Sequence, residues 1–409
     1  MQSQPKPPRQ PKRECEIPVI EKTDQLFVLL QHWLVSFLPA AMQPVAGVLL
    51  SVVAIVCIFP ALFALTTVFE RKGLGRIQNR LGPNRVGPFG LLQPVADGIK
   101  SLTKEDIVPL SADAVVHYLA PVVLVVAVFM GFAVLPMGRK MVLVDLDAGL
   151  LFYFAMGAST ELAVFMAGWS SRNKYSLLGA MRAVAQMISY EVVLLLSSVT
   201  VVMMTGSLSL TKIVEAQNQY SWGLPHWFIF TPWGCAGFAM YAIAATAETN
   251  RSPFDLPEGE SELVAGYHTE YSGFKFALFF LGEYLAMFSI SGLGTTLFLG
   301  GWSAPLSSLT WVPSWIWFFT KLMLSIFVFI WMRGTLPRLR QDQLMNFAWK
   351  FILPMCLLNL FVAGLWTYLG SGWLRWVICS AILIAAYAAM GWGEMRRGKI
   401  GPRSYRYAE

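Results

Sequence analysis

Long apolar segments recur along this chain, and charged residues gather in the stretches between them. A helix needs about 20 apolar residues to cross the hydrocarbon core of a bilayer. Inside lipid each backbone N–H and C=O must be paired within its own segment, so such spans are helices. We expect spans at about 44–68, 115–136, 148–168, 183–205, 232–248, 273–299, 312–333, 348–369 and 373–393. The pattern predicts an all-α, polytopic membrane protein with about nine transmembrane helices, eight plus a C-terminal one after Gly370-Ser371-Gly372.

The chain divides into three parts by composition. Residues 1–22 are basic and rich in proline, as in an extended or disordered arm. Residues 26–38 are apolar but too short to span a bilayer, and Pro39 ends them, so we expect an interfacial helix. We therefore predict an N-terminal extension over 1–43, a helical bundle with its loops over 44–370, and an extra C-terminal helix with a basic tail over 371–409.

A further amphipathic helix is expected after the first span. Seven apolar residues repeat there at roughly helical spacing: Phe89, Leu91, Leu92, Val95, Ala96, Ile99 and Leu102. Asp97 and Lys100 fall on the other face. This pattern is typical of a helix lying at the membrane interface.

Composition limits the possible functions. Only 13% of the residues are charged and 56% are hydrophobic, which excludes an ordinary soluble domain. The five cysteines form no CxxC pair and the four histidines are scattered, which argues against metal, haem, iron–sulfur clusters and a disulfide framework. Basic residues gather at span ends, where lipid head groups and topology explain the net charge of +7. We expect a lipid bilayer as partner, and no metal, no cofactor bound by this chain and no nucleic acid.

The basic residues also predict an orientation. Twenty-one Lys and Arg residues lie in the loops after odd-numbered spans and in the C-terminal tail, against four in the opposite loops. The positive-inside rule therefore places the odd-numbered loops and the C-terminus in the cytoplasm. The basic arm at the N-terminus then lies outside, in the periplasm, unless residues 26–38 cross the membrane.

The loops expected in the cytoplasm are dense in Gly, Pro, Arg and acids. The first contains Arg71, Arg80 and Arg85, and the last contains Arg333. Such arginines can serve only to set topology or can snorkel to the membrane surface. The third loop is different, because the topology rule does not call for acids. It sets one base, Arg251, against a group of acids that includes Asp255, Glu258, Glu260 and Glu262.

Carboxylates also lie inside the predicted spans. Glu161, Glu191 and Glu283 each stand about 8 to 10 residues from the cytoplasmic end of a different span. Glu248 closes the span at 232–248 and can link them to the acidic loop. A single intramembrane glutamate can be a hydrogen-bonded structural group. Three at one depth favour a buried polar layer that relays protons, because burial makes protonation sensitive to nearby charge.

Four loop sequences carry a specific resemblance. They occur in one order at span ends and read ERKGLGRIQNRLGPNRVGPFGLLQPVADGIK, GWSSRNKYSLLGAMRAVAQMISYE, AETNRSPFDLPEGESELVAGYHTEYSG and RGTLPRLRQDQLM. Over roughly residues 45–370 the chain resembles the quinone-site membrane subunit of respiratory complex I, the family of the NADH–quinone oxidoreductase H subunit or NADH dehydrogenase subunit 1. His268 departs from this pattern, since the family leads us to expect Asn or a similar residue there.

The resemblance implies a subunit of a proton-pumping translocase in a bacterial inner membrane, with a quinone such as ubiquinone as substrate. NADH, flavin and iron–sulfur clusters would belong to partner subunits. The expected partners are the peripheral-arm subunits that carry the terminal cluster, and small and antiporter-like membrane subunits.

The resemblance also implies roles for the residues named above. The quinone chamber and its coupling loop would contain Arg71, Arg80, Arg85, Asp97, Arg251, Asp255, Glu258, Glu260, Glu262 and Arg333. The proton path would contain Glu161, Glu191, Glu248 and Glu283. Two alternatives remain open at this point: a homologous membrane subunit of a hydrogenase or another donor–quinone complex, and a free-standing secondary transporter. A transporter predicts inverted repeats, and none is visible in the sequence.

Overall fold

The computed structural model describes residues 23–40, 42–221, 223–255, 265–370 and 372–397. The predicted arm at 1–22, the loop acids Glu258, Glu260 and Glu262, and the tail beyond residue 397 lie outside the described residues. The described residues are mostly helical and contain almost no strand, which confirms the all-α prediction. Its short hairpin pairs β1 (Tyr220–Ser221) with β2 (Leu224–Pro225).

Eight described helices are long and apolar enough to cross a membrane. Seven of them are single helices: α3 (Gln43–Ile77), α5 (Ala114–Phe132), α6 (Gly149–Ser170), α7 (Lys174–Thr205), α11 (Gly273–Phe298), α12 (Ser314–Thr335) and α15 (Trp373–Arg397). The eighth is composite and consists of α13 (Gln341–Phe347), the π-helical turn η5 (Ala348–Ile352) and α14 (Leu353–Tyr368).

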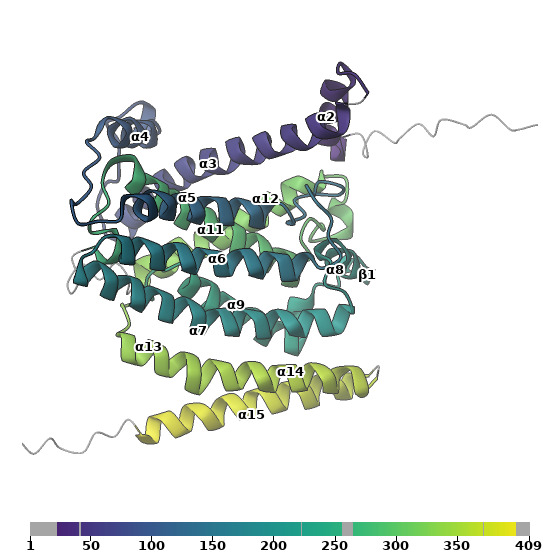
Figure 1. The fold of residues 1–409 in the computed structure, drawn as a ribbon. Coiled ribbons are helices and arrows are strands. Elements are labelled where there is room, and N and C mark those ends of the chain that lie inside the picture. Colours follow the sequence, from purple (N-terminus) through teal and green to yellow (C-terminus); the bar gives the residue numbers. More distant parts are fainter. Residues whose placement is uncertain (1–22, 41, 222, 256–264, 371, 398–409) are drawn as a thin grey trace, which may run out of the picture.

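The predicted span at 232–248 is helix α9 (Pro232–Glu248), which is not among these eight because it has 17 residues. At 1.5 Å per residue α9 is about 25 Å long, a little less than the hydrocarbon core of a typical bilayer. It nevertheless carries the chain back through the bundle, because α7 ends at one end of the molecule and α11 begins at the other (Figure 1). The bundle thus comprises the eight long helices and one short, enclosed one.

Helices α3 and α7 are longer than predicted. Helix α3 continues to Ile77, past the predicted end at 68, and α7 begins at Lys174 rather than at 183. The extra turns of α3 pack closely on α12, since a Cβ atom at Gly334 would lie 2.8 Å from the Ile77 side chain. At the start of α7, Asn173 caps the helix by accepting a hydrogen bond from the Tyr175 N–H at 3.0 Å. Charged residues that we assigned to loops are therefore helical.

The two ends of the bundle differ. One end, which we call the α4 end, carries η1 (Pro88–Gly90), α4 (Gln93–Thr103), η3 (Gly266–His268) and α13. The opposite end, which we call the α8 end, carries α2 (Leu26–Ser36), α8 (Leu210–Gln217), the hairpin, η2 (Phe228–Phe230) and η4 (Ser307–Leu309). Helix α4 is the later part of the predicted amphipathic helix, and Val95, Ile99 and Leu102 lie exposed along it. The predicted repeat began at Phe89, but Phe89 lies in η1 and the helix starts only at Gln93.

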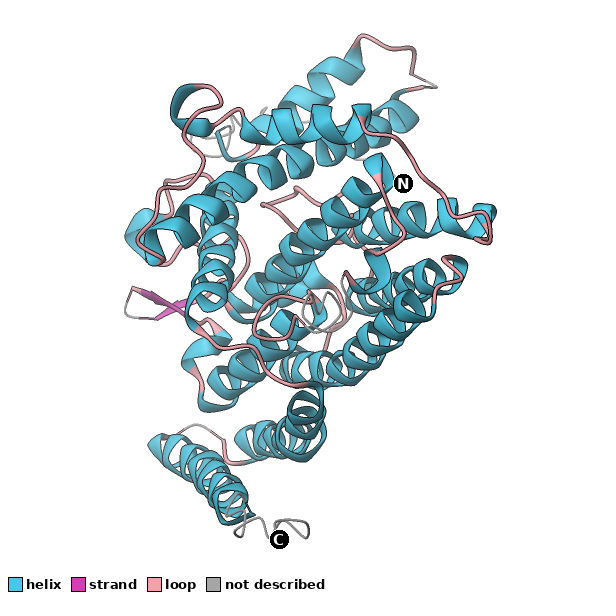
Figure 2. Cartoon of the chain, turned by 90° about the vertical axis from the view of Figure 1, so that its left-hand side faces the viewer, coloured by secondary structure: helices cyan, strands magenta, loops and turns pink. Residues whose placement is uncertain are grey.

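The core lies among α5, α6, α7, α9 and α11, which Figure 2 shows nearly end-on. Large side chains fill it, including Phe132, Tyr190, Phe288 and Phe298, all almost fully buried. Helices α3 and α15 flank this core, and much of their apolar surface is exposed. Such exposure is expected of helices that face lipid.

The start of the described chain is fixed at the α8 end. The Asp24 carboxylate accepts a hydrogen bond from the Ser314 N–H at 2.6 Å, at the first residue of α12. The rings of Phe27 and Trp315 meet edge to face with centroids 5.2 Å apart. The predicted helix at 26–38 therefore forms as α2 without passing through the bundle, and it begins at the end opposite the C-terminus of α15 (Figure 1).

Candidate functional site

A buried carboxylate stands at the centre of the α4 end. Glu70, on the late turns of α3, is only 4% exposed. Its Oε1 pairs with Arg251 at 3.3 Å and with Arg333, and its Oε2 accepts a hydrogen bond from the Tyr284 hydroxyl at 2.6 Å. The Arg251 guanidinium also lies over the Tyr284 ring, 3.9 Å from the ring centroid. One acid is thus held by two arginines and a phenol, from α3, the loop after α9, α11 and α12.

The other predicted arginines lie away from this cluster or on its rim. Arg71 forms an exposed ion pair with Asp97 of α4 at 2.6 Å, which ties α4 to α3. Arg80 is exposed and hydrogen-bonds Gln78 at 2.8 Å, and Arg85 is exposed on the loop before α4. The structure therefore brings Arg251 and Arg333 together, places Arg71 and Asp97 at the edge, and leaves Arg80 and Arg85 on the surface.

Asp255 follows Arg251 in the loop between α9 and α11. Burial raises the pKa of its carboxyl to about 6, although the nearby Arg338 and Arg333 act in the opposite direction. Arg338 also donates a hydrogen bond to the Asp255 backbone carbonyl. A carboxyl with this pKa is mostly ionised at pH 7 to 8 and takes up its proton below about pH 6.

These groups line a polar cleft of about 200 Å³. Its wall includes Glu70, Arg71, Arg251, Asp255, Glu283, Tyr284 and Arg333. Both signs of charge therefore face one space at the α4 end.

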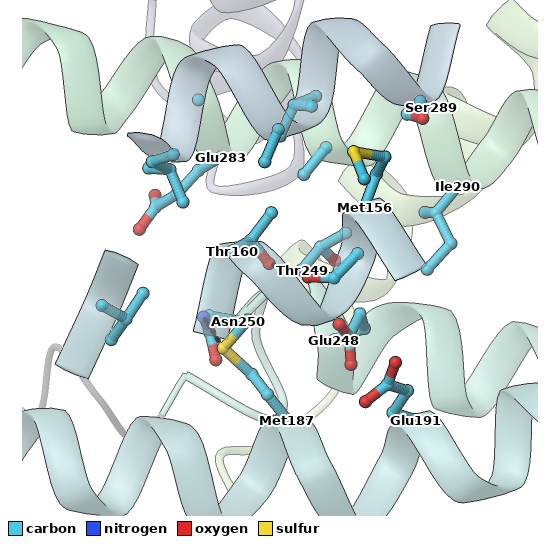
Figure 3. A pocket seen from close by; sticks show the side chains of 18 of the residues that line it. Met156, Thr160, Met187, Glu191, Glu248, Thr249, Asn250, Glu283, Ser289 and Ile290 are labelled. Carbon is cyan, nitrogen blue, oxygen red and sulfur yellow. Dashed lines mark hydrogen bonds between the residues drawn. The ribbon is translucent and has the colours of Figure 1, made fainter. Parts of the chain in front are cut away.

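A second, mostly apolar cavity of about 80 Å³ lies deeper in the bundle, among α5, α6, α7, α9 and α11. Three acids reach it: Glu191 of α7, Glu248 of α9 and Glu283 of α11. Figure 3 shows the carboxyl groups of Glu191 and Glu248 directed toward each other, with Thr160 and Thr249 on the side nearer Glu283. A volume of about 10–15 Å³ on this scale holds one water molecule, so the cavity has room for several.

Glu161 joins this group from α6. Glu161 is 8% exposed, and its carboxyl group interacts with that of Glu191. Both also act electrostatically on Glu248. The structure therefore brings Glu161, Glu191 and Glu248 into one cluster inside the bundle.

Glu283 connects the two spaces. Together with Asn250 it lines both the polar cleft and the deeper cavity. Its Oε1 accepts a hydrogen bond from the Tyr267 hydroxyl at 2.9 Å and faces His268 Nε2 at 3.4 Å. A line of acids therefore runs from Glu70 at the cleft through Glu283 to the cluster of Glu248, Glu191 and Glu161.

Sequence reasoning missed two parts of this site. We assigned Glu70 to a loop, although Phe59, Thr66 and Thr67 mark the buried face of α3 and Glu70 continues it at helical spacing. That spacing was the available signal. The hydroxyls of Tyr267 and Tyr284 were missed, because the sequence does not show that η3 and α11 direct them toward Glu283 and Glu70. Among the described residues, no group of three or more His, Cys, Asp and Glu side chains could hold a metal ion.

The fold and the site define a polytopic helical membrane protein with buried acids that connect to a charged cleft. A family model described as NADH dehydrogenase matches residues 50–364. The chain is 52% identical to the H subunit of NADH-quinone oxidoreductase from Dehalococcoides mccartyi strain CBDB1 over 72% of this chain and 80% of that protein. It is 51% identical to the H subunit from Brevibacillus brevis, over 72% of this chain and 86% of that protein. It is 43% identical to the H subunit from Polaromonas naphthalenivorans, over 84% of this chain and 97% of that protein. The chain belongs to the family of NADH-quinone oxidoreductase H subunits.

Proposed function

We propose that this chain forms the membrane side of the quinone chamber of NADH–quinone oxidoreductase and converts quinone reduction into proton translocation. Family membership makes the chain a membrane component of that multi-subunit enzyme, with quinone as the fitting substrate. The finer proposal concerns where the quinone reacts and how protons move. It rests on the arrangement of acids and arginines described above.

One observation carries the proposal: Glu283 lines both the cleft and the deeper cavity. A group that faces both spaces responds to charge in the cleft and exchanges protons with the cavity. Two unit charges about 8 Å apart interact by about 2 kcal/mol at an effective dielectric constant of about 20. That energy changes the proton occupancy of a carboxyl by about tenfold or more.

The chemistry then follows from the charge balance. Reduction of a quinone to quinol takes two electrons and two protons, so negative charge develops before the protons arrive. Arg251 and Arg333 balance Glu70, and Asp255 takes up its proton near pH 6. New negative charge in the cleft favours protonation of Glu283. The proton then passes through the deeper cavity, which has room for several water molecules, and along its hydroxyls to Glu248, Glu191 and Glu161.

Partners and location complete the proposal. The quinone head group would meet a peripheral subunit carrying the terminal iron–sulfur cluster at the α4 end, with NADH and flavin further away in partner subunits. Small and antiporter-like membrane subunits would receive protonation from the acid cluster. The α4 end and the C-terminus would face the cytoplasm of a bacterial inner membrane, and Asp24 at the α8 end would face the periplasm, as the positive-inside rule predicts.

The alternatives are not favoured. The relatives named above carry the name of the quinone enzyme rather than that of a hydrogenase. A free-standing transporter would not need a cleft in which arginines balance a buried acid at one end of the bundle.

Glu191→Gln tests the relay. Glutamine keeps the size and hydrogen-bonding capacity of the side chain but cannot carry an exchangeable acid proton. In membranes that contain the whole complex, we expect normal assembly by native gel and a loss of NADH-driven proton pumping by about tenfold or more.

The matched control is Glu215→Gln on α8, because Glu215 is an exposed acid at the opposite end of the bundle. Its variant should assemble and pump as the parent does. Full pumping by Glu191→Gln would refute the relay role of that residue.

A further inference from the structure

A histidine accompanies the acid that connects the two spaces. His268 on η3 is 5% exposed, and its Nε2 faces Glu283 Oε1 at 3.4 Å. The same oxygen accepts the hydrogen bond from Tyr267. The other ring nitrogen, Nδ1, is buried and has no hydrogen-bond partner among the described residues. His268 thus offers Glu283 one nitrogen and keeps the second available.

Aromatic rings pack tightly around His268. The rings of Phe276 and Phe279 lie edge-on to His268, with centroids 5.5 and 5.3 Å away, and the Tyr267 ring lies 3.8 Å away. These rings fix the imidazole beside the carboxyl and leave it little contact with bulk water. A buried polar atom without a partner costs free energy, so Nδ1 needs a water molecule or a proton-exchanging group.

We propose that His268 and Glu283 act as one acid–base pair, which adds a second proton-binding site to the acid line at its entry. The inference rests on the proposed function. In the transfer step the Nε2–H bond of the imidazolium breaks and an O–H bond forms on Glu283 Oε1. The products are a neutral imidazole protonated on Nδ1 and a neutral carboxylic acid. The electron pair of the broken bond stays on Nε2, so no other reactant is needed.

The pair connects the pH to proton loading. Imidazole is the side chain whose charge ordinarily changes between about pH 5 and 8. An amide at this position would offer an N–H to Glu283 but could not store a proton. The histidine therefore gives Glu283 a partner that can hold a proton of its own.

Several groups share the surroundings of the pair. Glu283 on α11 and Tyr267 on η3 face His268 directly, and Arg251 on the preceding loop acts electrostatically on Glu283. Asp255 interacts electrostatically with Glu283 across the cleft. Helices α6 and α7, which pack against η3, contribute the Ser170 hydroxyl at Tyr271 and the Ser176 hydroxyl at the Tyr267 carbonyl.

His268→Asn tests the pair in the intact complex, reconstituted in vesicles. Proton pumping is measured from about pH 5.5 to 8.5, which brackets the range in which imidazole titrates. Because the imidazolium donates the proton in the proposed step, pumping by the parent should fall along an alkaline limb as the pH rises through this range. The variant should lose that limb while it retains assembly. His268→Gln, with a longer amide, is the second variant if Asn impairs assembly.

The matched control is His117→Phe, because His117 is a fully buried histidine on α5 that stacks on Tyr271 with centroids 3.9 Å apart. It should keep the parental limb. If Glu191→Gln stops pumping while the His268 variants keep the parental limb, the histidine pair is overturned and the relay stands. If Glu191→Gln pumps fully, the relay of the proposed function fails at Glu191, whatever the His268 variants do.

Discussion

At the scale of residues, burial decides which charges have consequences. Glu70 and Arg251 are 5% and 9% exposed at their side chains, whereas Arg71 and Asp97 are 45% and 41% exposed. Both sets are ion pairs, but water and salt screen the second. Removing one member of a buried pair leaves its partner desolvated without compensation.

We therefore predict a large difference between two carboxylate removals. Glu70→Ala should destabilise the purified complex by about 3–5 kcal/mol, because Arg251 stays buried without its acid. Asp97→Ala should cost about 1 kcal/mol or less. Thermal unfolding of this chain, followed by loss of the native complex on gels, measures both. Equal melting temperatures for the two variants would contradict the buried-charge account.

Sequence reasoning named the acids inside the spans but could not say which charged groups they meet. Glu161, Glu191, Glu248 and Glu283 stand out because acids inside apolar segments are rare. Glu70 did not stand out, because it is followed by Arg71 and Lys72, a triplet that resembles the end of a span. Its two arginines lie far along the chain, and only the packing of α3 against α12 and against the loop after α9 shows that all three meet.

At the scale of elements, the sequence predicts where the helices lie but not how long they are. Apolar runs predicted the positions of the spans, since lipid demands them. The charged residues Glu70 and Arg182 marked false ends. Helix α3 continues past Glu70, whose charge neighbouring side chains accept, and α7 begins earlier, at Lys174, where Asn173 caps it. Helix α9 is short yet enclosed, and its neighbours rather than its own length hold it in the bundle.

The contact between Asp24 and Ser314 of α12 could not be predicted from the sequence either, because the two residues are 290 positions apart. The carboxylate satisfies a backbone N–H at the first residue of the helix and favours the positive end of its dipole. The N-terminal extension therefore stabilises the α8 end of α12.

Asp24→Ala should lower the stability of the protein by about 0.5–2 kcal/mol, the usual cost of losing a helix N-cap. Limited proteolysis of the extension and the melting temperature of the complex measure this effect. Ser36→Ala is the control, since its hydroxyl bonds only the carbonyl of Trp33 within the same exposed helix. No difference between the two variants would show that the contact does not stabilise α12.

At the scale of the whole molecule, the bundle separates two tasks. Its α4 end holds a cleft in which arginines and acids balance each other. Its interior holds carboxyl groups around a cavity with room for several water molecules. Glu283 belongs to both spaces, and Tyr267 and His268 hold it in place. Under the proposed function, charge made at one end would change protonation inside the bundle.

The most direct measurement is therefore the number of protons pumped per NADH oxidised by a Glu283→Gln complex in sealed vesicles, beside Glu215→Gln. We predict that the Glu283 variant assembles, still oxidises NADH with a water-soluble acceptor, and loses quinone-dependent pumping by about tenfold or more, while the Glu215 variant pumps normally. A Glu283→Gln complex that pumps the parental number of protons at the parental rate would contradict the account.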